Sequence, residues 1–146
     1  MTAAHDLASV GWFSFEDRCV SSRPGRWRRE LRPVLRGFAG RDRADDVLLA
    51  ASELVSNGVE HAGGVTALRV TGVAGTVTVE VEDPMPCMVE RSEERPERGR
   101  GLAITRAVAD SWGWYSTDAG KVVWARFDAR GAVTTATSRA PGRKAG

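Results

Sequence analysis

ELVSNGVEHA, residues 53–62, closes a long segment that has the apolar spacing of a helix. Apolar residues recur at intervals of three and four from Val47 to Ala62, and Gly63-Gly64 ends the pattern. At 100° per residue these apolar positions share one arc. Beside that arc runs a polar stripe formed by Glu53, Asn57 and His61. We therefore predict a long helix that presents a core face and, next to it, a face suited to chemistry.

The segments before this helix predict a strand and another helix. Asp42 suits the N-cap of the long helix, and the acidic residues that follow it suit the positive first turn. Between Gly25 and Ala39 apolar residues again recur at three and four. We predict a helix there, although Pro33 removes one backbone hydrogen bond. The mixed aromatic and polar residues of 11–20 predict an edge strand.

The residues after the long helix predict a hairpin and a lid. Residues 68–71 and 77–82 alternate between apolar and polar side chains around Ala74-Gly75, which indicates two strands with one buried face. Pro84 ends the second strand. Residues 84–98 hold three prolines and seven charged side chains. This segment is too polar to pack and longer than a loop that only connects two elements, so we predict a mobile functional loop that acts as a lid.

A further helix and strand complete the expected fold. Gly99-Arg100-Gly101 opens the helix, and Arg106 is spaced to pair with Asp110. Gly120-Lys121 precedes a strand at 122–127. The apolar face of the helix is expected to consist of Ile104, Val108, Ala109 and Trp112. The order of elements predicts an α+β fold, a two-layer sandwich with helices on one face of a mainly antiparallel mixed sheet.

Length and composition indicate one globular domain. The 146 residues have 42% hydrophobic and 27% charged side chains, inside the globular range. We expect an ordered domain over residues 10–129, with a flexible N-terminus (1–9) and a flexible tail (130–146). No run approaches the 18 apolar residues of a membrane span, and no basic start with an apolar stretch suggests export. We therefore expect a cytoplasmic protein.

Charge and cysteine content say little about partners. The formal net charge of +2 is too small to indicate nucleic acid or an anionic membrane. Eight arginines lie between Arg23 and Arg43, which leaves nucleic acid or an acidic protein as possible ligands of that segment. Because the chain has nineteen arginines and two lysines, base composition of the genome is the simpler explanation, and we expect no nucleic-acid partner. Cys19 and Cys87 lack zinc-site spacing and are expected to be reduced.

Four separated strings carry a family resemblance. They are ELVSNGVEHA (53–62), VEDP (81–84), GRGL (99–102) and GKVVW (120–124). In this order and spacing the chain resembles the histidine-kinase-like (GHKL) ATPases, and more closely the anti-sigma factor serine/threonine kinases of actinobacteria, over roughly residues 25–127. The resemblance implies a histidine-kinase-like ATPase fold that binds ATP with Mg²⁺, in residues 10–129.

The resemblance assigns chemistry to the polar stripe. Asn57 corresponds to the family asparagine that holds Mg²⁺, and an amide oxygen is a suitable hard, neutral ligand. Glu53, one turn earlier, corresponds to the general base that accepts the proton of the attacking hydroxyl. His61 continues the stripe, and we assign it no role in catalysis. A solvated surface position is the alternative for Asn57 and Glu53, whereas His61, at the helix end, is expected to pack or to support a neighbouring residue.

The resemblance places the other expected nucleotide contacts on three further segments. Asp83 corresponds to the carboxylate that accepts from the exocyclic amine of adenine. Gly99, Arg100 and Gly101 begin a helix, where free amides and the positive dipole end suit phosphates. Lys121 is expected to face the nucleotide.

Two departures from the family pattern leave the activity open. Asp83 is followed by Pro84-Met85-Pro86 where the wider superfamily has DxGxG, which indicates altered lid geometry. Val122 stands where the related string GKTVW has an adenine-binding threonine. The missing hydrogen bond is expected to cost about 1 kcal/mol of ATP-binding free energy. We expect a homodimer that phosphorylates a serine or threonine of an anti-anti-sigma antagonist and sequesters a sigma factor. The alternative is a weakened module that binds a regulator in an ATP-dependent way without phosphotransfer.

Overall fold

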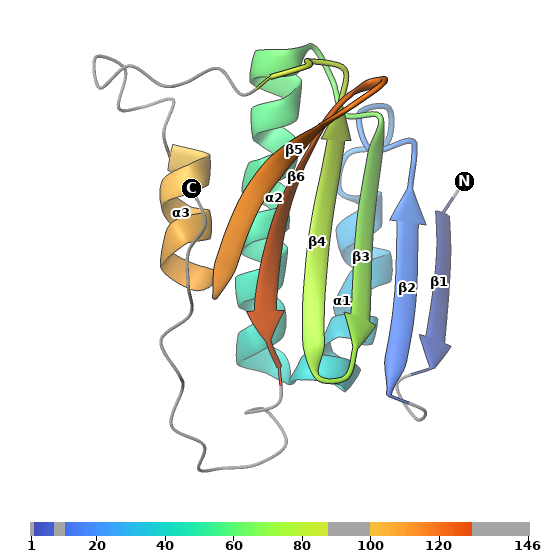
Figure 1. The fold of residues 1–146 in the computed structure, drawn as a ribbon. Coiled ribbons are helices and arrows are strands. Elements are labelled where there is room, and N and C mark those ends of the chain that lie inside the picture. The colour runs from blue at the N-terminus through green and yellow to red at the C-terminus, as the bar shows by residue number, and fades with distance from the viewer. Residues whose placement is uncertain (1, 8–10, 88–99, 130–146) are drawn as a thin grey trace.

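The computed structural model describes residues 2–7, 11–87 and 100–129 (Figure 1). The predicted tail (130–146) and most of the predicted lid lie outside these residues. The elements, in chain order, are β1 (Thr2–Leu7), β2 (Trp12–Asp17), α1 (Arg26–Ala39), α2 (Arg41–Ala62), β3 (Ala67–Val73), β4 (Thr76–Asp83), α3 (Arg100–Val108), β5 (Ser111–Thr117) and β6 (Gly120–Asp128).

The strands form one sheet in the order β1-β2-β3-β4-β6-β5. Each pair of neighbours runs antiparallel, so the described sheet contains no parallel pair. β3 and β4 form the hairpin predicted around Ala74-Gly75, where both turn residues have positive φ. The prediction of an edge strand at 11–20 was wrong, because β2 has β1 on its outer side. β1 itself lies in the segment that we expected to be flexible.

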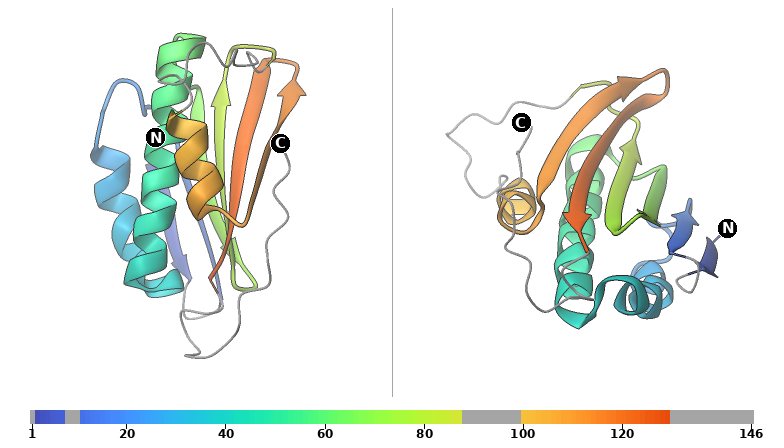
Figure 2. Two further views of the ribbon diagram at one scale, coloured as in Figure 1. Left: turned by 90° about the vertical axis from the view of Figure 1, so that its left-hand side faces the viewer. Right: turned by 60° about the horizontal axis from the view of Figure 1, so that its bottom comes forward.

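Within the described residues, three helices cover one face of the sheet and none covers the other face (Figure 2). α2 lies between α1 and α3 and packs against both (Figure 1). This arrangement confirms the predicted α+β fold with two layers. It follows from the alternation of β4, whose helix-facing side chains Val77, Val79 and Val81 are buried while the intervening ones are partly exposed.

The helix ends differ in two places from the sequence-based prediction. α2 begins at Arg41 with Gly40 as N-cap, and no side chain caps it, so Asp42 lies inside the first turn. α3 ends at Val108, and Trp112 is a buried residue of β5 rather than of the helix. Asp110 therefore lies beyond the helix, and Arg106 stacks on the ring of Trp112 at 5.2 Å.

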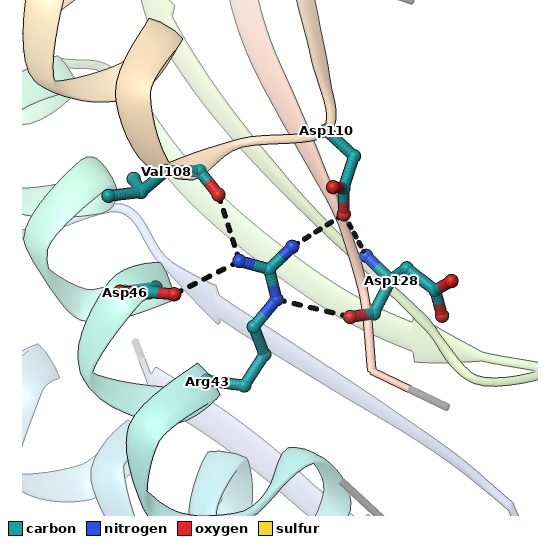
Figure 3. A network of polar contacts seen from close by, with 5 residues as sticks. All are labelled: Arg43, Asp46, Val108, Asp110 and Asp128. Atoms are coloured by element: carbon teal, nitrogen blue, oxygen red, sulfur yellow. Dashed lines mark hydrogen bonds and ion pairs between the residues drawn. The ribbon is translucent and has the colours of Figure 1, made fainter. Parts of the chain in front are cut away.

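Arg43 is the centre of a polar network that joins α2 to the distant parts of the chain (Figure 3). Its guanidinium donates to Asp46 on α2, to the backbone oxygen of Val108 at 2.8 Å and to the carboxylate of Asp110. It also donates to the backbone oxygen of Asp128 at 3.1 Å. The Asp110 carboxylate accepts the Asp128 amide as well. The N-terminal turn of α2, the end of α3 and the end of β6 are thus held by one planar cation.

The face of the sheet without helices carries charged and aromatic side chains. Arg69 on β3 donates to Glu82 on β4 at 2.9 Å. Gly113 on β5 leaves room for the Trp124 ring, since an added β-carbon would lie 2.8 Å from it. Burial of Tyr115 and the neighbouring Glu80 carboxylate both raise the pKa of Tyr115 above its usual value.

Because Tyr115 is the single tyrosine, its titration can be followed in the whole protein by absorbance. We expect a higher midpoint in the folded chain than in urea, and a lower folded midpoint in Glu80→Gln. Because the pKa of Tyr115 is raised in the folded state, its contribution to the free energy of unfolding is fully present below pH ~10, the unfolded value. That contribution is lost as the pH rises through the folded-state pKa. Equal midpoints in the folded and unfolded chains would contradict the assignment.

Candidate functional site

Three of the four motif strings meet at one end of the sheet. In Figure 1 the last turn of α2, the end of β4 and the β5–β6 turn lie at the same, upper end. Asp83 ends β4 and stands opposite Lys121 in the β4–β6 register. A β-carbon added at Gly58 of α2 would lie 3.9 Å from the Cβ of Asp83 and 2.6 Å from Val65. The backbone of α2 therefore lies close to the Cβ of Asp83, and the Val65 side chain packs so closely on residue 58 that only glycine fits there.

Asp83 forms a buried ion pair with Lys121. Asp83 follows Val81 on the helix-facing side of β4 and is 3% exposed, and Lys121 is 6% exposed. Lys121 Nζ lies 2.9 Å from Asp83 Oδ1 and 2.8 Å from Oδ2. The Met85 amide donates to Oδ1 at 2.9 Å. The carboxylate that we expected to read adenine is thus already paired with a cation from the neighbouring strand, and Oδ2 retains a lone pair that could accept from a further donor.

Gly120 brings the β5–β6 turn against the end of β4. Its φ is +153°, and an added β-carbon would lie 2.0 Å from the backbone oxygen of Asp83 and 2.7 Å from Pro84. Only glycine allows this approach. The described start of the predicted lid is held to the same turn, because Ser116 Oγ donates to the backbone oxygen of Pro86 at 2.8 Å.

The polar stripe of α2 has free hydrogen-bonding capacity beside Gly58. Glu53 and Asn57 are half-buried, and their side chains make no hydrogen bond or ion pair with the part of the chain that the structure describes. His61 Nε2 is buried with no hydrogen-bond partner and lies 3.8 Å from Glu60 Oε2. Successive members of the stripe are helix neighbours, about 5–6 Å apart at Cβ. Half-buried polar groups without partners are what a polar ligand would satisfy.

The loop after α2 is held in place by its own glycines. Gly63 adopts the left-handed conformation, and the Gly64 amide donates to Gly58 O at 3.1 Å. The Val65 amide donates to Ser21 Oγ at 3.3 Å. These bonds position Val65 against Gly58 and so fix the distance between α2 and Asp83.

The structure corrects the expected role of Val122. Side chains alternate along a strand, and Val122 stands opposite Glu82, one position away from the Asp83–Lys121 pair. Val122 therefore lies on the face without helices, and a threonine there would not reach a base held by Asp83. The weakening that we attributed to this residue does not apply.

The phosphate-binding string is described only in part. Arg100 and Gly101 are the first residues of α3, as predicted, and α3 packs beside α2 (Figure 2). Gly99 lies outside the described residues, as does the lid from residue 88 onward.

The chain matches the family of the histidine kinase-like ATPase domain over residues 21–127. This match covers more than half of the sequence and contains all four strings. The chain belongs to the histidine kinase-like ATPase domain family. No curated protein and no solved structure gave a significant match.

Membership of the histidine kinase-like ATPase family makes this an ATP-binding regulatory domain. The family usually binds its nucleotide with Mg²⁺. Asn57 fits that ion, because its half-buried amide oxygen is a hard ligand with no other described partner. The described residues contain no group of three His, Cys, Asp or Glu side chains that could hold a metal ion. No helix among them has the length and apolar character of a membrane span.

Sequence reasoning missed the ion pair of Asp83 and the network of Arg43. Lys121 was expected to face the nucleotide, but its partner depends on β4 and β6 being neighbours in register. The alternation of each strand places Asp83 and Lys121 on the apolar side of its own strand, but it does not indicate that the two strands are neighbours.

Proposed function

We propose that this protein is an ATP-dependent regulator of the anti-sigma factor type, which phosphorylates a serine or threonine of an antagonist protein and sequesters a sigma factor. The observation that carries the proposal is the position of Gly58 against Asp83, with the unpartnered side chains of Glu53 and Asn57 on the same helix. The end of β4 thus offers a buried base-reading acceptor, and the adjacent helix α2 offers a half-buried metal ligand and a half-buried carboxylate.

The proposed roles follow from the chemistry of each group. Asp83 Oδ2 accepts from the 6-amino group of adenine, and the amides that begin α3 at Arg100 and Gly101 bind phosphate oxygens. Asn57 would hold Mg²⁺, which would supply charge neutralisation at the transferred phosphoryl group. Glu53 accepts the proton of the attacking hydroxyl, whose oxygen bonds to the γ-phosphorus as ADP leaves. The polypeptide itself positions the nucleotide and the attacking hydroxyl, and it supplies one proton acceptor.

The proposed partners are proteins, and the protein is proposed to act as a homodimer. Arg43 is buried in its own network, and Arg26 pairs with Glu30 at 2.9 Å, so neither adds to a basic surface. The arginines of α1 that remain exposed are Arg28, Arg29, Arg32 and Arg36. An acidic surface of a partner protein is their proposed ligand.

A second candidate is a binding module without phosphotransfer. Pro84 and Pro86 favour it, because they follow Asp83 where the wider superfamily has DxGxG and so indicate altered lid geometry. Such a module would bind ATP and a regulator and leave the γ-phosphate in place.

Phosphotransfer assays with labelled ATP and candidate antagonist proteins test the proposal. Glu53→Gln is expected to reduce label transfer by about 10²–10⁴-fold, because a general base is lost, while ATP affinity stays within about twofold. Asn57→Ala is expected to lower Mg²⁺-dependent ATP affinity by about tenfold or more. Glu60→Gln is the matched control, since Glu60 is on the same helix and 66% exposed.

The outcomes separate the candidates. Transfer by Glu53→Gln at the wild-type rate would contradict the assignment of the base. ATP binding without transfer to any candidate selects the binding module. ATP affinity that is unchanged by Asn57→Ala and by Asp83→Ala would contradict the proposed site.

A further inference from the structure

The Asp83–Lys121 pair presents a hydrogen-bond donor and an acceptor side by side. Nζ contacts both carboxylate oxygens, and Oδ1 also accepts the Met85 amide. An ammonium has three N–H donors, and within the described chain Lys121 has no acceptor except the two oxygens of Asp83. At least one donor of the buried ammonium is therefore available beside Oδ2, which accepts only from Lys121 in the described chain.

The two groups point to the same side of the sheet as the rest of the candidate site. Asp83 and Lys121 stand opposite each other in the β4–β6 register, and both follow the buried, helix-facing residues Val81 and Val123. Gly58 of α2 approaches the Cβ of Asp83 from that side. The donor and the acceptor thus share the space where a base held by Asp83 would lie.

The choice of lysine is informative in a chain with nineteen arginines and two lysines. Lys121 is 6% exposed and contacts Asp83 through a single nitrogen. A compact ammonium can turn a donor from the carboxylate toward a ligand, whereas a guanidinium is a rigid, planar fork that suits a two-oxygen clamp. A role confined to neutralising Asp83 gives no reason to prefer lysine.

We propose that Lys121 is a second base-reading residue, which donates to N1 of adenine while Asp83 Oδ2 accepts from the 6-amino group. The Watson–Crick edge of adenine carries that donor and that acceptor as neighbours, so the ion pair complements it. The inference rests on the proposed function, because it requires adenine to bind at Asp83. It makes Lys121 a determinant of base selectivity in addition to a partner of Asp83.

Calorimetric titration with two ATP analogues tests this role. In 1-deaza-ATP a C–H group replaces N1, and purine riboside triphosphate lacks the 6-amino group. Wild type is expected to bind 1-deaza-ATP about 10–100-fold more weakly than ATP, the effect of one hydrogen bond to a charged group. Lys121→Met is expected to bind ATP and 1-deaza-ATP equally, and still to bind purine riboside triphosphate more weakly than ATP.

The comparison between analogues separates base reading from a structural role. If Lys121 only neutralised Asp83, Lys121→Met would change the affinities for ATP and 1-deaza-ATP by the same factor and leave their ratio at its wild-type value. Thermal unfolding by circular dichroism checks that the variant is folded. Should Lys121→Met fail to fold, Lys121→Gln retains an N–H donor without the charge and is expected to keep part of the preference for ATP.

The outcomes distinguish this inference from the proposed function. Wild type that binds ATP but binds 1-deaza-ATP as tightly would overturn the role of Lys121 and leave the ATP site standing. The same holds if Lys121→Met keeps the full wild-type preference for ATP. A protein that binds none of the three nucleotides overturns the proposed function and the inference with it.

Discussion

Replacement of Arg43 by methionine is expected to lower the free energy of unfolding by about 2–4 kcal/mol. The side chain of Arg43 is 11% exposed, and that of Asp110 is 20% exposed. Methionine fills much of the same space but removes the guanidinium donors from the backbone oxygens of Val108 and Asp128 and from the Asp110 carboxylate, which keeps the Asp128 amide as a donor. Urea unfolding followed by tryptophan fluorescence measures the loss, which corresponds to a melting temperature about 5–10 °C lower.

Two further variants test whether the network causes this effect. Arg32→Met removes an exposed arginine of α1 that has no described partner, and is expected to change stability by less than about 0.5 kcal/mol. Arg43→Lys keeps the charge but loses the planar fork, so an intermediate loss is expected. Equal stabilities of Arg43→Met and Arg32→Met would show that the contacts in Figure 3 do not stabilise the fold.

Replacement of Gly120 by alanine is expected to cost about 3 kcal/mol of stability and to weaken ATP binding. The added methyl would lie 2.0 Å from the backbone oxygen of Asp83 and 2.7 Å from Pro84 Cα. Both obstacles are backbone atoms, so the end of β4 has to move, and the Asp83–Lys121 pair moves with it. Thermal unfolding and nucleotide titration of the same preparation measure the two effects.

Gly63→Ala is the control for backbone strain alone. Gly63 also has a positive φ, +75°, but no atom lies within 4 Å of an added β-carbon. We expect a loss of about 1 kcal/mol, the usual penalty of a left-handed conformation for alanine. If Gly120→Ala were no worse than Gly63→Ala, the close approach at Asp83 would not be a constraint on the fold.

Local pattern was sufficient for the elements whose signal lies within one segment. The spacing of apolar residues up to Ala62, with glycine after it, predicted the end of α2 to the residue. Alternation on both sides of Ala74-Gly75 predicted the β3–β4 hairpin. Trp112 was misplaced because its spacing from Val108 also fits a helix, whereas in the structure the residues after α3 pair with β6: the Asp110 amide donates to Arg126 O, and Trp112 stands opposite Ala125.

The candidate site also contains features that local pattern could predict and others that it could not. Glu53 and Asn57 could be predicted as one polar face because helix geometry alone fixes their relation. Asp83 and Lys121 lie at the same end of the sheet, and their ion pair was not predicted. The alternation of β6 also places Val122 on the opposite face, which string comparison could not indicate.

The amino-acid sequence by itself determined the periodic elements, the family and the residues that carry polar groups, because these depend on spacing within a few turns or strands. Only the tertiary structure decided which strands are neighbours, and therefore that Lys121 neutralises Asp83 and that Arg43 joins three distant segments. The physical reason is that pairing across 38 or 85 residues depends on the packing of the whole core and leaves no local period in the chain.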